Sequence, residues 1–117
     1  MSLYYHLVPG MPMLLFDAAT PSAGLESQAV GIPKAPNSSD LGRRVTWRTK
    51  FATAPSVVNI SLQGAFRNVD AEYVDIDSST VVTVDGEYRT VLVAFSIVRA
   101  RINSFTGGTE YTVEISL

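Results

Sequence analysis

The chain has 117 residues, of which 46% are hydrophobic and 17% charged, with a formal net charge of -2 and no cysteine. This length predicts a single domain with a modest core. The missing cysteines exclude disulfide scaffolds, cysteine-ligated zinc sites and thiol catalysis. The acidic balance argues against a nucleic-acid binder. No run approaches the ~18 apolar residues that cross a membrane.

The first 42 residues predict an irregular N-terminal arm. Five of the six prolines fall there, and proline donates no hydrogen bond to a sheet. We therefore expect only short strands, over residues 3–8, 13–18 and 26–32, and a loop over 36–40. The arm begins without the basic region of a signal peptide, so we expect synthesis in a cytoplasm.

Residues 43–117 predict the core of a β-sandwich. Apolar and polar side chains alternate there with a period of two, which places them on opposite faces of a sheet. No convincing helix exceeds two turns. About seven or eight short strands separated by turn signals indicate an all-β antiparallel sandwich or jelly roll. The residues expected to face the core include Val45, Trp47, Phe51, Val58, Ile60 and Leu62.

Local signals predict where these strands end. Gly64–Ala65 is expected to break one strand, and Ser78–Ser79 to form a turn. Asp85–Gly86 predicts a two-residue hairpin, because both positions tolerate positive φ. The apolar phase then slips by one residue near 94–96, so we expect a bulge or bend between strands at 89–93 and 97–103.

The stretch from Phe95 to Leu117 predicts a closing hairpin with one apolar face and one charged face. Its turn is the Thr-Gly-Gly-Thr sequence at 106–109. In such a hairpin Arg99 and Arg101 would face the strand that carries Glu110 and Glu114. Cross-strand pairs of this kind contribute well under ~1 kcal/mol each.

No grouping of residues predicts catalysis or a cofactor. The single histidine, His6, is expected to be structural. The acidic residues Asp70, Glu72, Asp75 and Asp77 could supply oxygen ligands for calcium. However, their spacing fits no EF-hand loop, and alternation places Asp75 and Asp77 on an outward, solvated face. We expect no metal site and no enzyme.

Four aromatic residues could instead form a platform on which sugars stack, namely Trp47, Tyr73, Tyr88 and Tyr111. Trp47 has the same parity as Val45 and Phe51, so a buried tryptophan is the favoured interpretation. The aromatic residues therefore leave a carbohydrate-binding function open but do not favour it.

A resemblance to a known group of proteins rests on turn and core patterns between Arg43 and Leu117. These are Val45-Thr46-Trp47, Phe51-Ala52-Thr53-Ala54-Pro55, Val58-x-Ile60-x-Leu62-Gln63-Gly64, Val98-Arg99-Ala100-x-Ile102 and Ser104-Phe105-Thr106-Gly107-Gly108-Thr109. They resemble small virion proteins of tailed bacteriophages and, more remotely, the discoidin-type galactose-binding jelly roll. The Asn-Asp-Gly-x-x-Trp segment of discoidin-like sugar binders is missing at 65–70, so no ligand residue is carried over.

The resemblance implies a structural virion protein, with a capsid decoration or cement protein as the first expectation. Its partners would be the major capsid protein or other virion subunits and further copies of itself, with no nucleic acid, membrane or cofactor. It would be made in the host cytoplasm and reside in the virion. The alternatives are a carbohydrate-binding sandwich module and a tail or neck structural protein.

The apolar residues of the arm are the expected contact with neighbouring subunits. They are Met11, Met13, Leu14, Leu15 and Phe16. The alternative for residues 13–16 is a further core strand of the same domain. The two interpretations do not exclude each other.

Overall fold

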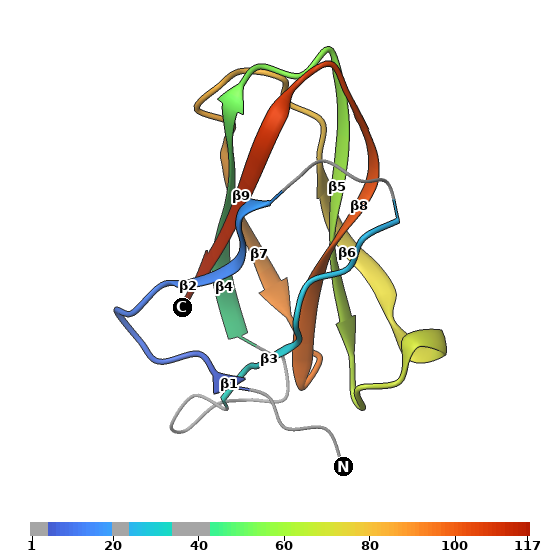
Figure 1. The fold of residues 1–117 in the computed structure, drawn as a ribbon. Helices are drawn as coiled ribbons and strands as arrows, with labels where there is room; N and C mark the ends of the chain where they lie inside the picture. Colours follow the sequence, from blue (N-terminus) through green and yellow to red (C-terminus); the bar gives the residue numbers. More distant parts are fainter. Residues whose placement is uncertain (1–4, 20–23, 34–42) are drawn as a thin grey trace.

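The computed structural model describes residues 5–19, 24–33 and 43–117, and these residues form a β-sandwich (Figure 1). One sheet has five strands in the order β1-β3-β8-β5-β6, and the other has four in the order β2-β9-β4-β7. All pairings are antiparallel except that between β1 and β3. The elements are β1 (Tyr5–His6), β2 (Met13–Ala19), β3 (Val30–Gly31), β4 (Arg43–Thr53), β5 (Val57–Ala65), a 3-10 turn η1 (Asp70–Glu72), β6 (Val74–Ser79), β7 (Tyr88–Val93), β8 (Ile97–Thr106) and β9 (Thr109–Ser116).

The predicted all-β sandwich is therefore confirmed. The core lies between the two sheets and contains the residues that alternation placed on the inner face. Trp47 is 1% exposed, and Ile60, Leu62 and Tyr111 are fully enclosed. Burying a large apolar side chain contributes about 1.5–3 kcal/mol. Phe16 packs edge-on against Tyr111 with ring centroids 5.0 Å apart, which ties β2 to this core.

The phase slip near residues 94–96 marks the point where the chain changes sheets. The strands predicted at 89–93 and 97–103 are present as β7 and the first part of β8. β7 pairs with β4 in the four-stranded sheet, whereas β8 pairs with β5 and β3 in the other. Each strand buries its own inner face, so the apolar parity differs on the two sides of the connection.

The predicted closing hairpin is wrong. β8 and β9 follow one another in the chain but belong to different sheets, and the link at Gly107–Gly108 crosses from one sheet to the other. Gly107 has a φ of 81°, which suits a residue without a Cβ. Arg99 and Arg101 therefore do not face the strand of Glu110 and Glu114. Alternation of side chains predicts which face of a strand is buried, but it does not predict which strand pairs with it.

Three further turn signals meet their predictions to different degrees. β5 ends at Gly64–Ala65, as predicted, and Gly64 also leaves space for a neighbouring ring: a Cβ there would meet Phe95 Cδ2 at 2.6 Å. Ser78–Ser79 completes β6. Asp85–Gly86 does form a tight turn, closed by the Gly86 amide on the Thr83 carbonyl at 2.9 Å. That turn lies in the crossover from β6 to β7 and joins no hairpin.

The N-terminal third contributes strands to both sheets. β1 and β3 lie at one edge of the five-stranded sheet, and β2 forms an edge of the four-stranded sheet. β2 matches the strand predicted over 13–18, whereas β1 and β3 are shorter than the predictions for 3–8 and 26–32. The predicted loop over 36–40 lies outside the described residues.

Candidate functional site

A tight turn before β2 presents apolar side chains to solvent. The Met11 amide donates to the Val8 carbonyl at 3.0 Å, and Gly10 takes a φ of 78°. Val8 is 50% exposed and Met11 63%. Leu7, immediately before the turn, is buried in the core and its amide donates to the Gly31 carbonyl at 2.9 Å. The turn is therefore anchored at its base and exposed at its tip, and it projects from the sandwich between β1 and β2 (Figure 1).

The five residues predicted as an apolar interface are divided between surface and core. Leu15 and Phe16 are buried, and Met13 is partly buried against the same core. Residues 13–16 are thus a strand of the sandwich, as the alternative interpretation had it. Met11 and Leu14 remain exposed, Leu14 on the outer side of the four-stranded sheet.

The outer face of the four-stranded sheet carries a mixed row of side chains, which we call the β2–β7 face. The register aligns Leu14, Glu114, Arg48 and Tyr88 across its four strands. Arg48 lies over the Tyr88 ring at 4.5 Å and donates from Nη1 to the Tyr88 hydroxyl at 2.8 Å. Its Nη2 donates to the Asp85 carbonyl at 3.3 Å. The five-stranded sheet packs on the opposite side and leaves this row at the surface.

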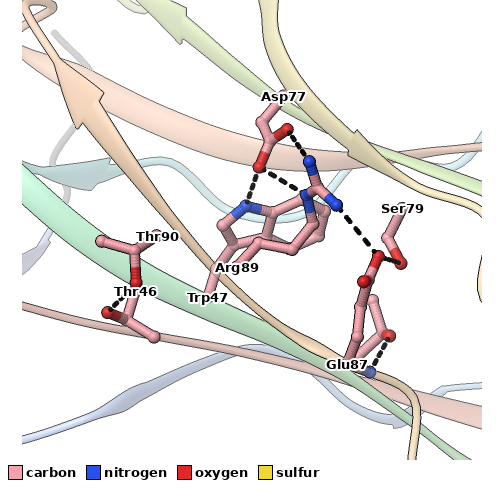
Figure 2. A network of polar contacts seen from close by, with 8 residues as sticks. Thr46, Trp47, Asp77, Ser79, Glu87, Arg89 and Thr90 are labelled. Carbon is pink, nitrogen blue, oxygen red and sulfur yellow. Dashed lines mark hydrogen bonds and ion pairs between the residues drawn. The ribbon is translucent and has the colours of Figure 1, made fainter.

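A polar network closes the side of the sandwich where β6 faces β7 (Figure 2). Arg89 donates to both oxygens of Asp77, from Nε at 2.8 Å and from Nη2 at 2.9 Å. Trp47 Nε1 donates to the same carboxylate at 2.9 Å. Glu87 accepts from Ser79 at 2.7 Å and from Arg89 at 3.3 Å. These bonds satisfy the single N–H donor of the buried indole and link the two sheets.

Asp77 reaches this network because of a bulge in β6. Leu62 pairs with Asp77 and Gln63 with Asp75, so Ile76 is an extra residue between them. A bulge changes the alternation of a strand. Asp75 and Asp77 consequently point to opposite sides of the sheet, and the prediction that both lie on an outward, solvated face is wrong for Asp77.

The charge state of Asp77 follows from these contacts. Burial alone raises the pKa of the carboxyl group, but the hydrogen bonds from Arg89 and Trp47 outweigh it and hold the pKa below its usual 3.8. The hydrogen bond to Asp77 in turn raises the pKa of Arg89. The pair is therefore ionised at neutral pH. The hydrogen bonds of Asp77 and Arg89 described above are made within the chain, and they join β6 to β4 and β7.

A second network, centred on Arg99, lies on the outer side of the five-stranded sheet. Its side chain is 8% exposed and forms ion pairs with Glu26 and with Asp70, the latter at 2.8 Å. It donates to Gln63 Oε1 at 3.0 Å and lies 3.7 Å from the centre of the Tyr73 ring. Arg99 thus fastens the segment before β3 and the loop before β6 onto the sheet. Sequence alternation placed it in a solvated hairpin and missed this role.

A shallow polar hollow lies beside the Arg99 network. Its volume is about 330 Å³, and its lining comprises Asn59, Ser61, Asp75, Ile76, Asp77, Ser78 and Asn103. Asn103 Nδ2 donates to Asn59 Oδ1 at 3.1 Å and to Ser61 Oγ at 2.6 Å. Gln63 fixes Asp75 with a 2.9 Å bond. Amide, hydroxyl and carboxylate groups are therefore held in place around the hollow.

The aromatic residues do not form a common platform. Trp47, Tyr73 and Tyr111 are buried, and Tyr88 is exposed on the β2–β7 face. Burial also raises the pKa of the Tyr111 hydroxyl. The favoured interpretation of Trp47 as a core residue is thus confirmed. His6 lies in β1 opposite Gly31, whose bare backbone accommodates the imidazole ring.

The described residues offer no candidate metal site. Within residues 5–19, 24–33 and 43–117, no three histidine or acidic side chains are placed to bind a metal ion. The same residues contain no helix long and apolar enough to span a membrane. No protein-family model matches the sequence, and a search of curated proteins gives no significant match.

Proposed function

We propose that this protein is a structural, non-enzymatic subunit of a tailed-phage virion, acting as a decoration or cement protein on the capsid. The supporting observation is the anchored turn that exposes Val8 and Met11. Exposed apolar side chains on a fixed backbone suit docking, because little conformational freedom is lost when a partner covers them.

In this role the protein would stabilise the capsid by mass action. A protein that binds assembled capsid subunits but not free or unfolded ones stabilises the shell in proportion to its occupancy. The sandwich supplies a rigid body, and the turn supplies the contact. Leu7 and Phe16 keep the turn in place from within the core.

The test is co-sedimentation of the purified protein with capsids of the phage that encodes it. Removing residues 1–16 would also remove Leu7, Leu15 and Phe16 from the core, so point substitutions are preferable. The double variant Val8→Asp, Met11→Asp should bind capsids much more weakly than the unaltered protein. The double variant Val69→Asp, Val82→Asp, at two exposed apolar side chains outside the turn and outside the β2–β7 face, is the matched control. Equal binding of all three proteins, or no binding to capsids at all, contradicts the proposal.

A second candidate function is carbohydrate binding, favoured by the polar hollow on the five-stranded sheet. Its amide and carboxylate groups match the hydroxyls of a sugar, and they are held in place by hydrogen bonds within the chain. The described residues that line the hollow include no aromatic ring on which a sugar could stack. A sugar in the hollow would therefore be held by hydrogen bonds alone, which makes carbohydrate binding the weaker candidate.

A glycan array separates the two candidates. Binding of a glycan by the unaltered protein, lost in Asn103→Ala and kept in Thr90→Ala, would support a carbohydrate site in the hollow. An array without any bound glycan, together with capsid co-sedimentation, would support the virion proposal instead.

A further inference from the structure

The β2–β7 face has a charge order that complements itself. Across the sheet, the central row reads apolar, acidic, basic and aromatic, through Leu14, Glu114, Arg48 and Tyr88. Leu14 is 42% exposed and Tyr88 67%. Reversing this order gives its complement: each apolar end meets the other apolar end, and the acid meets the base.

Glu114, the acidic member of the row, has no charged partner among residues 5–19, 24–33 and 43–117. Glu114 lies opposite Arg48 in the register, yet the Arg48 guanidinium turns toward Tyr88 and the Asp85 carbonyl. Among the described residues, nothing forms an ion pair or side-chain hydrogen bond with Glu114. Its carboxylate is partly exposed in the middle of the face and available to a cation from outside.

The neighbouring row allows a second sheet to approach. It consists of the small hydroxyl residues Ser116, Thr46 and Thr90, with the two threonine hydroxyls 3.0 Å apart. Small side chains beside the charged row do not obstruct another sheet that packs at the usual separation of about 10 Å. The outer face therefore combines a row of small side chains with exposed apolar ends.

We propose that the occupant of the β2–β7 face is a second copy of this chain, bound through a two-fold axis that runs along the strands between β9 and β4. This rotation places β2 over the partner's β7 and β9 over the partner's β4. Glu114 then faces the partner's Arg48, and Leu14 faces the partner's Tyr88. Each contact occurs twice, as in any two-fold interface.

The dimer does not depend on the virion assignment, since it requires only this face. Four strands about 4.8 Å apart make a small interface, so association at the weak end of the range for specific complexes is expected. The paired charges should set the register and the choice of partner more than the affinity. The dimer should accordingly weaken as salt concentration rises.

The experiment is sedimentation velocity over a range of protein concentrations, with two charge-reversed variants. Glu114→Lys and Arg48→Glu each place two like-charge contacts in the homodimer, so each should raise the dissociation constant at least about tenfold. An equal mixture of the two variants should restore association. In the mixed dimer the introduced lysine meets the introduced glutamate, and the original Arg48 meets the original Glu114.

Controls separate this outcome from misfolding. Arg67→Glu, an equivalent charge reversal at an exposed position on the loop after β5, should leave the dimer unchanged. Thermal unfolding of each variant checks that the fold is intact. A protein that stays monomeric at all concentrations overturns the proposal. So does a dimer that is insensitive to both reversals, or a mixture that associates no better than either variant alone.

Discussion

Arg89 on β7 forms a two-point ion pair with Asp77 on β6, and this contact joins the edge strands of the two sheets across the side of the sandwich. The Asp77 side chain is only 14% exposed. Paired and hydrogen-bonded in this way, a partly buried carboxylate stabilises the fold, whereas an unpaired one destabilises it.

Asp77→Asn should lower the free energy of unfolding by about 2 kcal/mol, because the charge-assisted bonds to Arg89 are lost. Urea denaturation followed by tryptophan fluorescence measures the change, since Trp47 also bonds to this carboxylate. Asp85→Asn is the control. It removes one carboxylate from an exposed turn and should change stability by no more than about 0.5 kcal/mol.

Acid should destabilise the protein through the same residue. The pKa of Asp77 is lower in the folded protein than its usual 3.8. A carboxyl group whose pKa is lower in the folded protein than in the unfolded protein stabilises the fold at pH values above its unfolded pKa. This contribution is lost as the pH falls through the folded pKa. The free energy of unfolding should therefore decline as the pH falls from the unfolded pKa of 3.8 through the lower pKa of the folded protein. The decline should be less steep in Asp77→Asn than in the unaltered protein. Identical pH profiles for the two proteins would show that Asp77 makes no such contribution.

Gly86→Ala should be severely destabilising, and Gly10→Ala should not. Both glycines have positive φ, at 61° and 78°, so both variants carry the backbone strain of about 1 kcal/mol. Only at Gly86 would the new Cβ also collide with backbone, at 2.0 Å from the Thr49 carbonyl oxygen, whereas nothing lies within 4 Å at Gly10. Melting temperatures of the two variants measure the difference, and equal values would contradict the packing described around the turn.

Arg99→Met should loosen the segment before β3 more than it lowers global stability. Glu26 would lose its ion pair, while both acidic partners could regain water because they are partly or largely exposed. Amide hydrogen exchange should accelerate at Ser27, whose amide donates to the Ala100 carbonyl. Arg44→Met serves as the control on the other sheet. Unchanged exchange at Ser27 in Arg99→Met would mean that Arg99 does not hold this segment.

Much of the strand pattern follows from the sequence because alternation is local. The break near 94–96 and the burial of Trp47 were predictable from side-chain parity, and the strand at residues 13–18 from the positions of the prolines and glycines around it. Glycine and serine were less informative: Gly64 could not be recognised as a site of close packing against Phe95, because that contact joins segments 31 residues apart in sequence (95 minus 64).

The polar networks could not be predicted for a related reason. Asp77 turns inward through a bulge that depends on the pairing of β6 with β5. Arg99 is enclosed by Glu26, Asp70 and Tyr73, and all three are far from it in the sequence. Parity within one strand carries no information about such neighbours.

The all-β class, most strand positions and the inward-facing apolar side chains follow from local sequence, since they depend on the period of two within each strand. Which strands are neighbours follows only from the folded chain. The fold places β8 and β9 in opposite sheets, and it aligns Glu114 with Arg48 on an open face. Strand pairing depends on how two sheets close over a common core, and that is a property of the whole chain.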